Sequence, residues 1–245
     1  MELSLPLLAG VAATFILAGL IKGVIGLGLP TVGMALLGLM MVPGEAAALL
    51  VVPSLVTNLW QLAVGPGLTG LLRRLWPLLA GICLGTWAGG GLLDGLSASD
   101  AARGLGLALV LYAGLGLAQL HLRLPRRHEA WLGLPVGLAT GVVTLATGVF
   151  VVPAVPYLQA LDVDKDELIQ GLGLSFTVST LALAASLARA GVMSLPLMEA
   201  SVLALLPAAL GMVLGQWLRG RVTQQVFRRC FFAGLLAVGL HLITA

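Results

Sequence analysis

A single lysine, Lys22, lies between two apolar stretches and is the side chain of this sequence best placed to do chemistry. It follows the run Leu5–Ile21 and precedes the run Val24–Val42. A charge at the centre of a helix in lipid costs about 2.5–3.5 kcal/mol. Glycines and a proline interrupt the apolar pattern directly after it. A cation beside such a break indicates an anion-binding site within a membrane.

The segment after Lys22 supplies the backbone of that site. Its glycines allow the chain to turn and to approach a ligand closely. Its proline suits the first turn of a new helix, where the missing N–H costs nothing. The N–H groups of Thr31, Val32 and Gly33 are then expected to be free, at a helix terminus that favours anions. The candidate residues of this first half-site are Lys22, Gly23, Gly26, Gly28, Pro30 and Thr31.

Hydroxyl groups replace the cation in the second half of the chain. The hydroxyl side chains there are Thr140, Thr144 and Thr147. Thr147 could N-cap the helix that follows. Polar side chains also recur in the third apolar segment of each half. They are Ser54, Thr57, Asn58 and Gln61 in the first half, and Ser175, Thr177, Ser179 and Thr180 in the second.

We predict that the oxyanion is held by neutral donors as well as by the lysine. Thr57, Asn58 and Gln61 share one helix face, and Thr144, Thr147, Ser175 and Thr177 are the candidates from the second half. Two alternatives remain at this stage. The polar groups could link helices to one another, and Lys22 could reach an interface while the glycines only pack helices.

Composition defines the class of protein that positions these residues. Of the 245 residues, 59% are hydrophobic and 9% are charged, whereas a soluble domain has about 25% charged residues. Long apolar runs predict an all-α polytopic membrane protein, and the alternating strands of a barrel are absent. The N-terminus lacks the basic region of a signal peptide, so we interpret it as the first membrane segment. The net charge of +3 is no nucleic-acid signal, and no metal or cofactor motif occurs.

Ten apolar segments divide into two similar halves. The segments are Leu5–Ile21, Val24–Val42, Ala46–Val64, Leu75–Leu93, Gly104–His121, Trp131–Leu145, Thr147–Leu161, Leu168–Ala188, Leu195–Leu218 and Cys230–Thr244. The matched stretches are Gly19–Val24 with Gly137–Val142, Pro53–Asn58 with Gly173–Val178 at a shift of 120, and Gly85–Gly89 with Gly211–Gly215 at a shift of 126. We therefore predict a first repeat (residues 1–122), a basic cytoplasmic linker (123–129) and a second repeat (130–245).

The basic residues orient the two halves. With an odd number of crossings per half, one face receives Arg73, Arg74, Arg123, Arg126, Arg127, Lys165, Arg219, Arg221, Arg228 and Arg229. The other face receives only Arg103 and Arg189. This bias places both termini outside the cytoplasm and makes the repeat inverted, as in many secondary transporters. Because two upright spans need about 40 residues, more than Trp131–Leu161 contains, we expect broken or re-entrant helices at the start of each half.

These features together resemble the sulfite exporter TauE/SafE family of membrane permeases. The resemblance is carried by Ala18–Gly28, by the polar segment Pro53–Gln61 and by the second copy that starts at Gly137, and it covers nearly the whole chain. It implies a transporter of the bacterial inner (plasma) membrane for sulfur-containing anions such as sulfite and organosulfonates. The second copy, Val142–Gly148, has fewer glycines than is usual in the family, although Pro153 remains.

The sequence thus predicts a secondary transporter, with export as the expected direction, for a sulfite, sulfonate or carboxylate anion. Alternating access would proceed around Lys22 and Thr147, driven by gradients, because no Walker-type loop occurs. An anion channel is the alternative. An intramembrane enzyme is disfavoured because Ser175 lacks a Gly-x-Ser-Gly setting and no histidine lies near a segment centre. The partners are a small anion and the lipid bilayer, and a homo-oligomer is not excluded.

Overall fold

The computed structural model describes residues 5–65, 67–92, 97–118, 123–219, 221 and 223–244. Within these residues the secondary structure is entirely helical, in agreement with the all-α prediction. The helices are α1 (Leu5–Ile25), α2 (Leu29–Leu37), α3 (Pro43–Val64), α4 (Leu68–Leu92), α5 (Ala98–Ala118), α6 (Arg126–Thr147), α7 (Ala154–Ala160), α8 (Lys165–Arg189), α9 (Leu195–Leu203), α10 (Leu205–Arg219) and α11 (Gln224–Thr244).

Eight helical segments are long and apolar enough to cross a membrane, counting α9 and α10 as one. The two exceptions are α2 and α7, with 9 and 7 residues. At 1.5 Å per residue they are about 14 and 10 Å long, against a hydrocarbon core of about 30 Å. Five tryptophans, at least 60% exposed, lie on the surface of this bundle, as membrane-interface side chains do. The chain is a polytopic helical membrane protein.

The first helix of each half is longer than the sequence pattern suggested. We expected two short segments at the start of each half, but α1 and α6 have 21 and 22 residues and each can span the membrane. The reason in α6 is that the helix begins at Arg126, within the stretch 123–129 expected to be a linker. Only the second segment of each pair is short.

Two glycine breaks separate the long helices from the short ones. Gly26 and Gly28, with φ of 80° and 112°, follow α1, and Gly148, with φ of 69°, follows α6. A positive φ is unfavourable for residues with a side chain, so these positions favour glycine. The amide of Gly26 donates to the Lys22 carbonyl oxygen at 2.7 Å. The amide of Gly148 donates to the Thr144 carbonyl oxygen, also at 2.7 Å.

The predicted N-cap at Thr147 is wrong. Thr147 is the last residue of α6, and its hydroxyl donates to the Val143 carbonyl oxygen. The same hydroxyl accepts a hydrogen bond from the amide of Val149 at 3.1 Å. Residue Pro153, six positions later, occupies the N-cap of α7. The non-helical stretch 149–151 between them, which the sequence pattern did not reveal, separates the threonine from the next helix.

Close glycine contacts join α1 to α10 and α4 to α6. A Cβ added at Gly23 would overlap backbone atoms of Met212 and Gly215, and a Cβ at Gly141 would overlap those of Ile82 and Gly85. Small residues allow helices in lipid to approach this closely. The partner glycines in these contacts, Gly85 and Gly215, lie 130 positions apart. The shift of 126 expected from Gly85–Gly89 stays a prediction.

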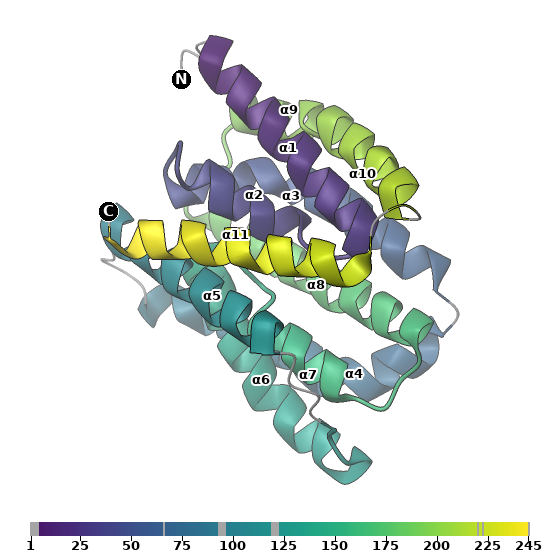
Figure 1. The fold of residues 1–245 in the computed structure, drawn as a ribbon. Coiled ribbons are helices and arrows are strands. Elements are labelled where there is room, and N and C mark those ends of the chain that lie inside the picture. Colours follow the sequence, from purple (N-terminus) through teal and green to yellow (C-terminus); the bar gives the residue numbers. More distant parts are fainter. Residues whose placement is uncertain are drawn as a thin grey trace.

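The remaining long helices pack around these pairs. The pairs α3 with α8 and α5 with α11 are in extensive contact, and Figure 1 shows α5 and α11 crossing in front of α8. Both labelled chain ends lie toward the left of Figure 1, and α11 begins toward the right. The short helix α2 is almost completely buried between α1, α3 and α5. This arrangement places the break after α1 inside the bundle.

Candidate functional site

Lys22 lies at the centre of the candidate site. It is in the last turn of α1, only 5% exposed, and its ammonium nitrogen reaches two side chains of α3. The Nζ donates to Oγ1 of Thr57 at 3.0 Å and to Oδ1 of Asn58. Thr57 and Asn58 are themselves buried, at 3% and 0% exposure. The candidate residues Lys22, Thr57 and Asn58 therefore lie together in the structure.

This lysine has no acidic partner among the described residues. The structure there contains one ion pair, between Arg74 and Glu129. A cation removed from water is costly unless a counter-charge or several hydrogen bonds compensate it. The Thr57 hydroxyl and the Asn58 amide oxygen supply only neutral acceptors. The site thus provides no counter-charge for the lysine among the described residues.

Several polar atoms around α2, α3 and α8 are buried without a hydrogen-bond partner in the described part of the chain. A buried donor or acceptor left in this state costs about 1–3 kcal/mol. Such groups often form the lining of a site that a polar ligand or water satisfies. The atoms are Oγ1 of Thr31, Oγ of Ser54, Nδ2 of Asn58, Oγ of Ser175 and Oγ of Ser179.

A small cavity lies where the two breaks approach each other. Pro30 at the start of α2 and Gly148 after α6 both line it. Ser54 of α3 and Thr180 of α8 line the same space. Its volume is about 10 Å³, close to the minimum that holds one water molecule. The structure therefore brings the two breaks and the two polar third segments together, around a space smaller than an oxyanion.

Other predicted residues are used for helix packing or for backbone hydrogen bonds. Gly23 packs against α10, and the Gln61 side chain donates to the Ile169 carbonyl oxygen of α8 at 2.9 Å. The hydroxyls of Thr144 and Thr177 each donate to the carbonyl four residues earlier on their own helix. These contacts correspond to the alternative interpretation, in which polar groups link and stabilise helices.

The free helix terminus is also smaller than expected. The amide of Val32 donates to the Gly28 carbonyl oxygen at 2.7 Å. This bond forms because α2 begins at Leu29, one residue before the proline. The prediction that the N–H groups of Thr31, Val32 and Gly33 are free at the break is therefore wrong for Val32. Thr31 remains in the first turn, with its hydroxyl unpaired.

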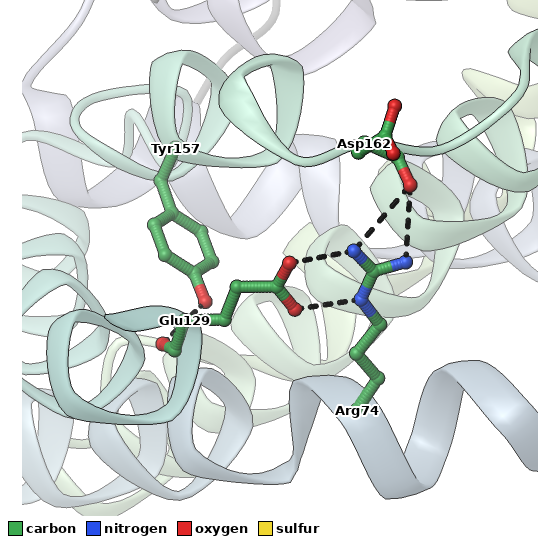
Figure 2. A network of polar contacts seen from close by, with 4 residues as sticks. All are labelled: Arg74, Glu129, Tyr157 and Asp162. Carbon is green, nitrogen blue, oxygen red and sulfur yellow. Dashed lines mark hydrogen bonds and ion pairs between the residues drawn. The ribbon is translucent and has the colours of Figure 1, made fainter. Parts of the chain in front are cut away.

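A second polar cluster was missed by the sequence interpretation. Figure 2 shows Arg74 of α4 forming two parallel 2.7 Å hydrogen bonds to the carboxylate of Glu129 on α6. The guanidinium also lies 3.4 Å from the Asp162 carbonyl oxygen, and the Tyr157 hydroxyl donates to the Glu129 carbonyl oxygen at 2.8 Å. The Glu129 side chain is 7% exposed, although we had assigned it to a linker.

The location of Glu129 at the start of a helix could have revealed this cluster.

A second missed residue, Gln170 of α8, is 1% exposed and bridges two segments of the first half. Its side chain accepts from the amide of Gly67 and donates to the Leu62 carbonyl oxygen. With Gln61, it forms reciprocal amide links between α3 and α8. The sequence pattern did not distinguish Gln170 from an ordinary polar residue near the start of a helix.

Comparison with known proteins agrees with this architecture. No curated protein and no solved structure matches the chain. The family model described as "Sulfite exporter TauE/SafE" matches residues 11–242. This match includes α2 to α10, the Lys22 cluster and both glycine breaks. The chain therefore belongs to the sulfite exporter TauE/SafE family of membrane transporters.

Proposed function

We propose that this protein is a secondary transporter that exports a small oxyanion, and that Lys22 binds the anion. The observation that carries the proposal is a buried lysine whose hydrogen-bond partners, Thr57 and Asn58, are both neutral. In a membrane interior such a charge favours binding of a species that brings the opposite charge. The family points to sulfite or a related anion.

The surrounding groups suit an anion with several oxygens. An ammonium group has three donors, and two of them are used by Thr57 and Asn58. Nδ2 of Asn58 and the hydroxyl of Thr31 are further buried donors without a partner among the described residues. Sulfite, a sulfonate or a carboxylate would accept hydrogen bonds from such groups. We assign substrate contacts to Lys22, Thr31, Thr57 and Asn58, with Ser175 as the candidate from the second half.

We propose an inverted repeat as the basis of alternating access. The contacts of α1 with α10 and of α6 with α4 share one register, which supports equivalence at shifts of 118 and 130. An α1–α2 pair corresponds to α6–α7, and α3 corresponds to α8. Under the positive-inside rule, both termini then lie outside the cytoplasm of a bacterial cell, with an inner-membrane location. Both chain ends lie toward the left of Figure 1, as two termini on one face of a membrane would.

The proposed site is asymmetric. Helix packing makes Thr140 the counterpart of Lys22, whereas the glycine that ends each helix makes Thr144 the counterpart. The two differ by one turn because α6 continues further beyond its glycine contacts than α1 does. Both threonines are fully buried. In either case, the position in the second half that corresponds to Lys22 carries a hydroxyl group.

Flux measurements in liposomes test the proposal. Purified protein in vesicles loaded with labelled sulfite should show saturable efflux, and Lys22→Met should abolish most of it. Linear flux up to high concentration would instead favour a channel. Unchanged efflux in the Lys22→Met variant would exclude the lysine as the anion ligand. Vesicles without protein and vesicles with Arg127→Gln, an exposed basic position, serve as controls.

A further inference from the structure

A large cavity in the described structure is lined by neither Lys22, Thr57 nor Asn58. It has a volume of about 750 Å³ and lies between α5, α7, α8 and α11, near the ends of α1 and α10. At about 30 Å³ per molecule it would hold roughly 25 waters. That volume is far larger than sulfite, and it falls within the usual range of small-molecule sites.

The wall of this cavity carries four basic residues. They are Arg123, Lys165, Arg219 and Arg228. Asp162 is the one acidic residue in the lining, and its carbonyl oxygen accepts from Arg74. None of the four cations forms an ion pair within the described residues. The cavity therefore carries an excess of positive charge between low-dielectric walls, a geometry that concentrates anions.

Apolar residues of the cavity wall lie close in sequence to residues of the candidate site. Ile25 and Leu27 flank Gly26, the first residue after α1, and both line the cavity. Ile25 lies three residues after Lys22. From α8, Leu172 also lines the cavity, three residues before Ser175. A hydrophobic constriction of this kind separates a wet compartment from a binding site until the surrounding helices move.

We infer that this cavity is an anion vestibule, in which the transported oxyanion gathers before it passes the Ile25–Leu27 constriction to Lys22. The inference rests on the proposed function and adds where the substrate approaches. All four cations belong to the face that the charge bias predicts to be cytoplasmic. The vestibule thus accepts substrate from inside the cell, as export requires. Its volume admits both a hydrated inorganic oxyanion and an organic sulfonate.

The basic residues of the same face provide matched controls. Arg228 lines the vestibule, whereas its neighbour Arg229 is exposed and does not. The test variant carries Arg123→Gln, Lys165→Gln, Arg219→Gln and Arg228→Gln. The control variant carries Arg73→Gln, Arg126→Gln, Arg127→Gln and Arg229→Gln, which removes the same charge from positions outside the lining. Each single variant, Arg228→Gln and Arg229→Gln, repeats the comparison if a quadruple variant does not fold.

Accessibility of a cysteine measures the electrostatics of the vestibule without transport. Gln159 lines the cavity and is exposed, so Gln159→Cys in a Cys83→Ser, Cys230→Ser background provides a reporter thiol. Its labelling rate is compared in detergent for ethyl methanethiosulfonates that carry either a sulfonate or a trimethylammonium group. The vestibule variant should lower the anionic-to-cationic rate ratio by about tenfold. Equal ratios in the vestibule and control variants would overturn the inference.

Transport kinetics provide the second measurement. In liposomes the vestibule variant should raise KM for sulfite and for an alkanesulfonate by about tenfold, with kcat retained, and the control variant should not. A higher KM for the sulfonate alone would identify an organic anion as the ligand of the vestibule. A higher KM for both substrates would show that the vestibule recognises the oxyanion group that they share. Wild-type vesicles that transport neither anion would refute the proposed function. Wild-type transport with identical KM in both variants would refute the vestibule alone.

Discussion

Lys22 donates a 3.0 Å hydrogen bond to the hydroxyl of Thr57, which lies 35 positions later on a different helix. The same hydroxyl donates to the Pro53 carbonyl oxygen at 2.7 Å, within α3. This chain of contacts orients the threonine so that its oxygen accepts from the ammonium group. The lysine is thereby linked to α3 by neutral partners and has no acidic partner among the described residues.

Removal of this charge should separate transport from stability. A hydrogen bond to a charged group is worth about 1.5–3 kcal/mol, so Lys22→Met should lower kcat/KM for the anion by about tenfold or more. The fold should be retained, because a buried charge without a counter-charge is replaced by an apolar side chain of similar length. Flux in liposomes and thermal unfolding in detergent measure the two effects. A large fall in Tm together with lost flux would point to a structural role.

Gly26 should be required for the shape of the break. Its φ is +80°, and a Cβ there would meet no atom within 4 Å, so Gly26→Ala introduces backbone strain without a clash. Such strain costs about 1–2 kcal/mol, a factor of about 5–30 in an equilibrium. Transport should fall because the Gly26 amide is bonded to the Lys22 carbonyl oxygen.

The matched control for Gly26 is Gly191, between α8 and α9. Its φ is +70°, and a Cβ there also meets nothing within 4 Å. Gly191→Ala should lower Tm by a similar amount and leave the transport KM unchanged. Similar transport defects in both variants would mean that strain acts through overall stability and not through the Lys22 site.

Removal of Arg74 and removal of Glu129 should lower the stability of the protein by different amounts. Arg74→Met leaves the Glu129 carboxylate, 7% exposed, without its partner, which costs about 3–5 kcal/mol for a buried charge. Glu129→Leu should cost less, because the Arg74 side chain is 21% exposed and can reach water. The double variant should be more stable than Arg74→Met alone. Thermal unfolding of all four proteins in detergent gives the coupling free energy, and strict additivity would contradict a direct pair.

Glycine packing between α4 and α6 should tolerate no side chain. At Gly141 a Cβ would overlap backbone atoms of α4, and such overpacking costs about 1–3 kcal/mol. At Gly114 on α5 a Cβ meets nothing within 4 Å, and alanine is favoured over glycine in a helix by about 0.5–1 kcal/mol. Gly141→Ala should therefore lower Tm in detergent, and Gly114→Ala should not. Equal Tm values would show that α4 and α6 are further apart than described.

The C-terminus of α11 should be outside the cytoplasm. Ten basic residues gather on the opposite face in the proposed orientation, and the positive-inside rule assigns that face to the cytoplasm. A reporter enzyme active only outside the cytoplasm should be active when fused after residue 245. The same C-terminal fusion in a variant that carries Arg126→Gln and Arg127→Gln tests whether the orientation depends on those two charges. Activity of a cytoplasm-only reporter at the C-terminus would refute the inverted repeat.

The sequence by itself determined the protein class and the centre of the candidate site. An apolar chain with 9% charged residues could form only a membrane protein. Short-range rules then located the break after Lys22, because glycine and proline restrict the backbone locally. The sequence also marked Lys22, Thr57 and Asn58 as candidates for one site, and the structure brings their side chains together.

Tertiary structure decided which helix each side chain contacts. The sequence did not reveal that Gln61 links to α8 or that Glu129 is buried beside Arg74. In lipid, all faces of a membrane helix are apolar, so periodicity does not indicate which face is buried. Such contacts depend on the crossing of helices distant in sequence, and the same crossings create the basic cavity beside the site.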